Sequence, residues 1–284
     1  ANNQCVPYAS HNHGKPVLTT CWSPDSKFLF SGGADNLVYM MDVDTKQTKV
    51  VAKHDQPIQA VRIVMTGSEP VLATGSWDKT IKFWDLKQEA PVHSIDLPER
   101  CYAMDSRGSI LVAALAELQY FCFDTNSPQT PRTTKSQNSY QLTSVAIFHD
   151  GTGYVGGSIE GRAEIQVFNP TSDKDCFAYR CHRSNGQTFP INQVRVNPST
   201  GTFITAGGDG EMIVWDKDSK SRTGSFASEP KAPVTACAYT SDGNRVAYAT
   251  GEDWSKGVRN VEKTLTGRIM IRNLTPTLRD PKKA

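Results

Sequence analysis

The sequence predicts an all-β protein built from six copies of one short-stranded unit. Alternating segments are set off by Gly, Asp, Ser and Pro, and no segment has the period of a long amphipathic helix. A proline followed by an apolar residue, or a weaker equivalent, recurs along the chain, and the apolar members are Val17, Ile58, Cys101, Leu142, Ile191 and Val234. Their separations are 41, 43, 41, 49 and 43 residues. A period of ~40–45 residues with four short strands per unit is typical of a WD-repeat β-propeller.

The first unit begins at Val17 and has an incomplete internal pattern. Ser31 and Asp35 lie four residues apart, and His13 precedes them. Met41 stands six residues after Asp35, where the next unit has a tryptophan.

The second and fifth units share a fuller pattern of a threonine, an aspartate and a tryptophan at intervals of four and six residues, each preceded by a histidine. An aspartate in a tight turn can accept a proton from that histidine, which can bond the threonine hydroxyl, which in turn can bond the indole N–H. Each group satisfies the next, so such a polar chain can be buried. We therefore expect two structural tetrads, His54, Thr74, Asp78 and Trp84 in the second unit and His182, Thr205, Asp209 and Trp215 in the fifth.

The third, fourth and sixth units, which begin at Cys101, Leu142 and Val234, are recognised by spacing alone. We predict one propeller domain over residues 1–284, with a basic C-terminal tail at 274–284. Residues 1–10 are expected to be an outer strand that closes the ring by completing the last unit, since propellers avoid raw sheet edges. Alternatively, this segment is the outer strand of a blade whose other strands are missing.

Composition excludes several protein classes. No apolar run approaches the ~20 residues of a membrane span, and the N-terminal residues lack the profile of a secretory signal. The net charge is +2, so an anionic partner would need a local basic patch. The seven cysteines include no CxxC pair, which favours reduced, mostly buried thiols.

No catalytic or cofactor motif stands out. GTGYVG at 151–156 matches GxGxxG, but it precedes no helix that could bind a phosphate. Cys176, Cys181 and His182 could begin a metal site, but no second ligand pair has a matching spacing. We expect no enzyme, no metal and no cofactor. A propeller enzyme or a generic scaffold is the alternative that a cleft with converging carboxylates would favour.

Five motifs in order resemble one family of propellers. They are GSWDKTIKFWD (75–85), LPERCY (97–102), GSIEGR (157–162), CHRSNG (181–186) and DWSKG (253–257). Together they resemble the nuclear mRNA-export WD-repeat proteins, which bind a nucleoporin through its GLEBS motif. That family is seven-bladed, and this chain lacks the inner strands of its first blade. The resemblance therefore implies a seven-bladed native architecture with a truncated first blade and six repeats present here.

The resemblance implies an adaptor that binds an extended acidic and apolar peptide through its turns. Arg162 follows Gly161 in an expected turn, where its fork could clamp a carboxylate. The other candidate peptide-binding residues are Trp77, Lys79, Arg100 and Arg183. Each of these side chains could instead be an ordinary solvated turn residue. Glu211 places a negative charge near this expected site.

A second candidate site lies in the insertion between Gly251 and Thr266. Its candidate RNA-binding residues are Trp254, Lys256, Arg259 and Lys263. An exposed tryptophan flanked by cations can stack a base and bind phosphates. Alternatively, Trp254 folds back and covers the edge of its sheet.

These features predict a non-enzymatic adaptor in nuclear mRNA export. Its partners are expected to be a GLEBS nucleoporin and RNA or ribonucleoprotein, in the nucleus, at the nuclear envelope and pore, and in the cytoplasm. The alternative is a mitotic spindle-checkpoint scaffold of the sister family, which holds checkpoint kinases through a similar motif. DWSKG favours the export branch.

Overall fold

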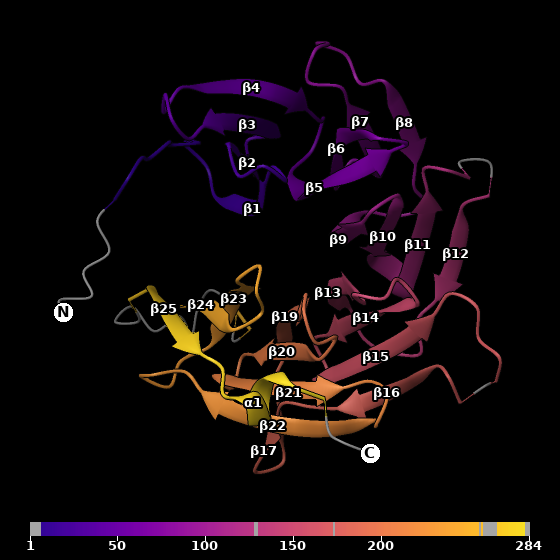
Figure 1. The fold of residues 1–284 in the computed structure, drawn as a ribbon, viewed down its shortest axis with the longest axis vertical. Coiled ribbons are helices and arrows are strands. Elements are labelled where there is room, and N and C mark those ends of the chain that lie inside the picture. Colours follow the sequence, from indigo (N-terminus) through magenta and orange to yellow (C-terminus); the bar gives the residue numbers. More distant parts are fainter. Residues whose placement is uncertain (1–6, 128–129, 173, 256, 258–265, 282–284) are drawn as a thin grey trace. The chain divides into compact units, whose positions relative to one another are not determined.

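The computed structural model describes residues 7–127, 130–172, 174–255, 257 and 266–281. The chain divides into two compact units, residues 1–104 and 105–284, and the boundary falls within one strand, β9. Nearly all regular structure in the described residues is β-strand, as the sequence predicts (Figure 1).

The first unit holds two four-stranded antiparallel sheets, each in the order of the chain. One consists of β1 (Val17–Trp22), β2 (Phe28–Gly33), β3 (Leu37–Asp42) and β4 (Thr48–Lys53). The other consists of β5 (Ile58–Thr66), β6 (Glu69–Ser76), β7 (Thr80–Trp84) and β8 (His93–Asp96).

The second unit continues the pattern from β9 (Cys101–Arg107), β10 (Ile110–Leu115), the short 3-10 turn η1 (Ala116–Leu118), β11 (Gln119–Asp124) and β12 (Arg132–Lys135). The next sheet has β13 (Leu142–Ile147), β14 (Gly153–Ser158), β15 (Arg162–Val167) and β16 (Phe177–Arg180). A small hairpin of β17 (Arg183–Ser184) and β18 (Gln187–Thr188) precedes β19 (Ile191–Val196), β20 (Phe203–Gly207), β21 (Glu211–Asp216) and β22 (Ser221–Ala227). The last sheet has β23 (Val234–Tyr239), β24 (Arg245–Thr250) and β25 (Arg268–Asn273).

The six propeller sheets begin at the six residues that the sequence period marks, so the predicted fold class is confirmed. The strands β1, β5, β13, β19 and β23 also share an irregularity, because the pairing register shifts between their first and third residues. A bulge of this kind twists a strand and re-aims its side chains. Its recurrence at one position shows that the units repeat in detail.

Within each unit, neighbouring sheets pack their apolar residues against each other. In the first unit, Phe30, Ile58 and Trp84 belong to one buried cluster. In the second, Phe148, Ile191 and Trp215 belong to another, and a further cluster lies beside it around Val214 and Tyr248. A strand covered on both faces has no solvent side, which is why all six residues of β14 are buried.

The closing strand at residues 1–10 and the basic tail at 274–284 stay predictions, and the described parts of the chain ends have the following structure. Residues 7–10, the described part of the expected closing strand, belong to no strand, and residues 1–6 lie outside the described part. The expected basic tail contains a short helix, α1 (Pro276–Arg279). Leu278 lies against Gly224 of β22, and the hydroxyls of Thr200 and Thr202 each donate to the Arg279 carbonyl at 2.8 Å. The helix α1 therefore packs on this sheet, because Leu278 makes an apolar contact and the Arg279 carbonyl accepts two hydrogen bonds.

Candidate functional site

The second sheet contains a continuous polar chain of four side chains. His54 Nδ1 lies 2.8 Å from Asp78 Oδ2, and His54 Nε2 lies 2.7 Å from Thr74 Oγ1. The indole of Trp84 donates to the same hydroxyl at 2.9 Å. Because a carboxylate only accepts, Nδ1 carries the imidazole hydrogen and Nε2 accepts from the threonine. All four residues of this expected tetrad are therefore joined.

The fifth sheet of the chain repeats the arrangement. His182 Nδ1 lies 2.9 Å from Asp209 Oδ1, its Nε2 lies 2.9 Å from Thr205 Oγ1, and Trp215 donates to that hydroxyl at 3.1 Å. The first sheet has a shorter version, because His13 contacts Asp35 at 3.0 Å and Ser31 at 2.8 Å while Met41 offers no N–H.

The surroundings of the tetrad side chains favour an ionised aspartate and a neutral histidine. Burial of Asp78 opposes ionisation, but hydrogen bonds from Thr80 and His54 prevail and lower its pKa. Desolvation lowers the pKa of His54 despite the neighbouring carboxylate. The pKa of Asp209 is likewise lowered against its burial by His182. Each aspartate is thus held ionised within the fold, as a structural acceptor needs.

The fourth sheet replaces the tetrad with a buried glutamate that the sequence reasoning missed. The fully buried Glu164 accepts hydrogen bonds from the Ser136 hydroxyl, the Gln166 amide, the Asn138 amide at 3.1 Å and the Gln137 N–H at 2.9 Å. Glu164 and Gln166 alternate with apolar residues, which on a sheet with one solvent face would predict exposure. The burial of Glu164 could have been recognised, because a strand of a sheet that lies between two other sheets has both faces covered.

Three predicted peptide-binding residues lie at one end of the second sheet. Trp77 is exposed to 38% in the turn after β6. Arg100 is exposed in the loop before β9. Lys79 is not a free cation beside the tryptophan, because its ammonium contacts Glu99 at 2.7 Å and lowers the pKa of that carboxyl. The two charges largely offset each other, so Trp77 is the more available group of this turn.

Arg162 differs from its predicted place in a turn. It is the first residue of β15 and is half-buried, because the chain enters the strand directly after Gly161. Its Nε atom is buried and has no hydrogen-bond partner among the described residues. Arg183, on the exposed hairpin, donates through Nη2 to the Glu160 carbonyl at 3.4 Å, so it lies against the same turn. The structure therefore brings these two arginines to the turn that also exposes Ile159.

The expected negative charge at Glu211 is compensated. Glu211 is the first residue of β21, and its carboxylate contacts the Lys231 ammonium at 3.0 Å. An ion pair presents less net charge to a ligand than a lone carboxylate does. The expected repulsion at the peptide site is correspondingly smaller.

Trp254 is exposed to 60%, so in the described structure it does not fold back over its sheet. It lies in a turn, with a φ of 61°, and the Gly257 N–H donates to its carbonyl at 2.9 Å. The other three predicted RNA-binding residues, Lys256, Arg259 and Lys263, lie outside the described residues.

The GTGYVG turn and the cysteines, which were considered as cofactor or metal sites, have the following structure. The turn in GTGYVG leads into β14, a strand and not a helix. The six described cysteines are free thiols, and within the described residues no group of three metal-ligating side chains gathers. Among the same residues, no helix is long and apolar enough to span a bilayer.

Comparison with known proteins places these features in context. The family model described as WD domain, G-beta repeat matches residues 5–42, 45–85 and 177–216, the three segments that hold a histidine–aspartate chain. The chain is 37% identical to "Poly(A)+ RNA export protein" of Schizosaccharomyces pombe over 95% of its length and 78% of that protein. It is 36% identical to "Protein Rae1" of Drosophila melanogaster, with 96% and 81% covered, and 36% identical to "mRNA export factor" of Danio rerio, with 99% and 80% covered.

Proposed function

Because the chain belongs to the family of WD-repeat mRNA export factors, we propose that it is a non-enzymatic adaptor in mRNA export. It binds a GLEBS-type peptide of a nuclear pore protein and single-stranded RNA. Such a protein works in the nucleus, at the nuclear envelope and pore, and in the cytoplasm.

The Nε atom of Arg162, which is buried and has no hydrogen-bond partner among the residues that the structure describes, carries the peptide part of this proposal. A buried N–H that lacks an acceptor costs free energy, and a carboxylate supplied by a partner removes that cost. Arg162 also offers a planar fork that can hold a carboxylate with two parallel hydrogen bonds. The neighbouring Ile159 is exposed and gives the same peptide an apolar contact. An acidic and apolar segment therefore fits this turn.

Calorimetry with a synthetic GLEBS peptide tests the peptide site. Arg162→Glu should weaken binding by about 2–5 kcal/mol, because a pairing contact becomes a repulsive one in a desolvated setting. The matched control is Lys49→Glu, the same charge reversal on an exposed strand position, which should leave the affinity unchanged. Equal affinities for the Arg162 variant and the wild type would remove Arg162 from the site.

The exposed Trp254 supports the RNA part of the proposal. Stacking of one base on an indole contributes about 1–3 kcal/mol. Trp254→Ala should therefore weaken binding of an oligouridine roughly 5–150-fold, whereas Trp22→Ala, another exposed tryptophan, should not. Lys256→Ala should reduce the dependence of the affinity on salt, since phosphate contacts release counterions. If both tryptophan variants bind RNA like the wild type, the stacking role is wrong.

Checkpoint kinases are the alternative partners of the peptide site. A pull-down from nuclear extract with wild type and Arg162→Glu distinguishes them. Our proposal expects a nuclear pore protein to be lost in the variant, and loss of a checkpoint kinase alone would favour the alternative.

A further inference from the structure

Four hydroxyl residues of the chain are followed directly by a proline, and they are Ser23, Ser127, Thr130 and Thr275. Such a pair is the minimal substrate of a proline-directed protein kinase. Because proline has no backbone N–H, it can enter a kinase subsite that offers no acceptor, where the N–H of another residue would be left unpaired. Phosphoryl transfer also requires that the hydroxyl oxygen reach the γ-phosphorus of ATP, so the hydroxyl must be exposed and free of a tight turn.

Two of the pairs are held in local structure that hides them from a kinase. The Ser23 hydroxyl donates to Asp25 Oδ1 at 2.6 Å and accepts from the Phe28 N–H at 2.9 Å, so it is the centre of the turn between β1 and β2. Thr275 is the N-cap of α1, and its proline is the first residue of that helix. Its carbonyl accepts from the N–H groups of Leu278 and Arg279, each at 2.9 Å.

Thr130 is presented differently. It is exposed, and with Pro131 it leads directly into β12 outside any helix or turn. A residue before proline favours extended backbone, which β12 continues. The Thr130 hydroxyl donates only to the Ser127 carbonyl, at 3.3 Å, which is long for a hydroxyl donor. Of the three pairs whose two residues the structure describes, Thr130 therefore has the most accessible hydroxyl, while the proline that follows Ser127 lies outside the described residues.

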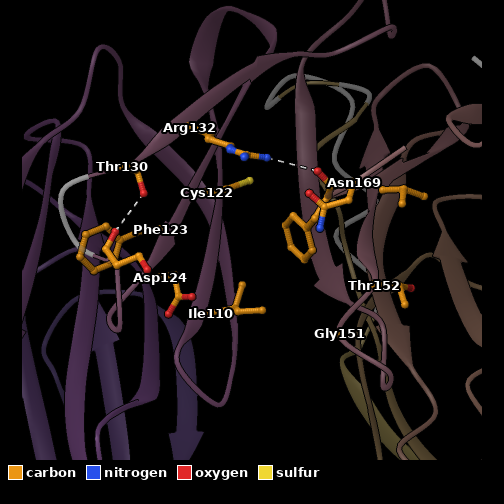
Figure 2. Close-up of a pocket in the computed structure, with 12 residues that line it drawn as sticks. Ile110, Cys122, Phe123, Asp124, Thr130, Arg132, Gly151, Thr152 and Asn169 are labelled. Carbon is orange, nitrogen blue, oxygen red and sulfur yellow. Dashed lines mark hydrogen bonds between the residues drawn. The ribbon is translucent and has the colours of Figure 1, made fainter. Parts of the chain in front are cut away.

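A cation lies on the same side of this segment. Thr130 and Arg132 are two residues apart on an extended chain, so their side chains point the same way. Both line a cavity of about 460 Å³ in the second unit, between the sheet β9–β12 and the sheet β13–β16. Figure 2 shows them in its upper part, with Asp124 and Ile110 below. Arg132 is exposed, and its Nη1 donates to the Phe168 carbonyl at 3.3 Å.

We propose that Thr130 is a phosphorylation site of a proline-directed protein kinase and that its phosphate binds the Arg132 guanidinium. In the transfer, Thr130 Oγ1 forms a bond to the γ-phosphorus of ATP, and the bond from that phosphorus to the β–γ bridging oxygen breaks. The hydroxyl proton goes to the catalytic aspartate of the kinase, and ADP leaves. The product carries three acceptor oxygens and a charge of about −1.5 to −2.

The phosphate changes the partner of Arg132. A phosphate is a stronger acceptor for a guanidinium than a neutral carbonyl is, because the hydrogen bonds are charge-assisted on both sides. Arg132 therefore exchanges the Phe168 carbonyl for the phosphate, and one link between the two sheets is released. Phosphorylation thus loosens the contact between β12 and the end of β15.

The position of Asp124 decides where the phosphate lies. This carboxylate is on the cavity wall, with Oδ1 accepting from the Asn126 N–H at 2.9 Å. Its negative charge opposes entry of the phosphate into the cavity. The phosphate consequently stays at the rim, where Arg132 is exposed and is the one cation among the described lining residues.

The first test incubates the whole protein with a purified mitogen-activated protein kinase, Mg²⁺ and ATP, and locates the phosphate by mass spectrometry. Thr130 should be modified at least about tenfold faster than Ser23 and Thr275, a difference of about 1.4 kcal/mol in activation free energy. Free heptapeptides with the three sequences are the control and should differ less, because they lack the fold. Thr130→Ala should remove this phosphate and Thr130→Ser should retain it. Phosphate on Ser127 but not on Thr130, or a rate ratio no larger than that of the peptides, would overturn the proposal.

The second test measures the pairing with Arg132 by ³¹P NMR titration of the phosphorylated protein. A phosphothreonine ordinarily loses its second proton with a pKa near 6, and a neighbouring cation lowers that pKa. The phosphate should therefore have a lower pKa in the wild type than in Arg132→Gln. Lys135→Gln removes a charge from the same exposed strand but outside the lining, so it should titrate like the wild type. Equal pKa values in the wild type and Arg132→Gln would overturn the assignment of Arg132 as the phosphate's partner.

Discussion

The sheet β5–β8 and the sheet β13–β16 have the same four-stranded order but bury different polar groups. In the first, Asp78, His54, Thr74 and Trp84 form a chain in which each member satisfies the next. In the second, four donors converge on the single acceptor Glu164. Nearby, the Tyr120 hydroxyl and the Asn138 side-chain oxygen are buried without a partner among the described residues. The fold therefore requires hydrogen bonds for its buried polar groups, but it does not require a tetrad in every sheet. The Glu164 cluster that replaces the tetrad is less complete, because two buried polar atoms beside it have no partner among the described residues.

The largest effect should come from removing the acceptor on which several donors converge. Glu164→Leu leaves the donors of Ser136, Asn138 and Gln166 and the Gln137 N–H unpaired, and each unsatisfied buried group costs about 1–3 kcal/mol. We expect a loss of more than about 3 kcal/mol in the free energy of unfolding, measured by urea denaturation. A loss below about 1 kcal/mol would mean that water or rearrangement replaces the carboxylate.

A smaller effect is expected in the tetrads. Asp78→Ala and Asp209→Ala should each destabilise the protein by about 1–3 kcal/mol per group left unsatisfied, chiefly the histidine Nδ1–H. Because the two chains have the same geometry, the two variants should differ little from one another. If either variant unfolds at the wild-type urea concentration, that tetrad is not a structural element.

The positions of the strands could be predicted from the sequence better than the buried polar groups. The first strand of each sheet begins where the chain enters the core, so its first apolar residue recurs once in every sequence repeat. The tetrads could also be predicted, because the threonine, aspartate and tryptophan of each are spaced by one hairpin and a histidine precedes each repeat. The hydrogen-bond partners of Glu164 could not, since three of its four donors come from a segment 26 to 28 residues away and share no local spacing with it.

In the candidate sites too, the exposure of single residues could be predicted from the sequence, whereas contacts between distant residues could not. The exposure of Trp77 and Trp254 agrees with their turn positions, because a turn has no neighbouring strand to cover it. The pairing of Lys79 with Glu99 depends on a contact between the turn after β6 and the loop after β8, which the sequence pattern does not encode.

The stability of the protein should depend on pH through the buried His54. The pKa of His54 is lower in the folded protein than its ordinary value near 6.5, so the unfolded chain binds the proton more readily. Stability should therefore fall as the pH drops from about 7 to 5, which spans the ordinary histidine pKa. His54→Asn should be less stable at pH 7 but should lose less on acidification, as measured by urea midpoints at both values. An identical pH dependence in the variant and the wild type would exclude His54 as the source.

The central claim is that buried polar chains hold the fold while residues in and beside the turns bind the partner. The most direct test measures the melting temperature and the GLEBS-peptide affinity of Thr74→Val and Arg162→Glu side by side. Thr74→Val removes the hydroxyl that joins His54 to Trp84, so its melting temperature should fall while the affinity of the folded protein is unchanged. Arg162→Glu should melt close to the wild type and lose the peptide. Loss of affinity in Thr74→Val without a change in melting temperature, or unchanged affinity in Arg162→Glu, would contradict this division.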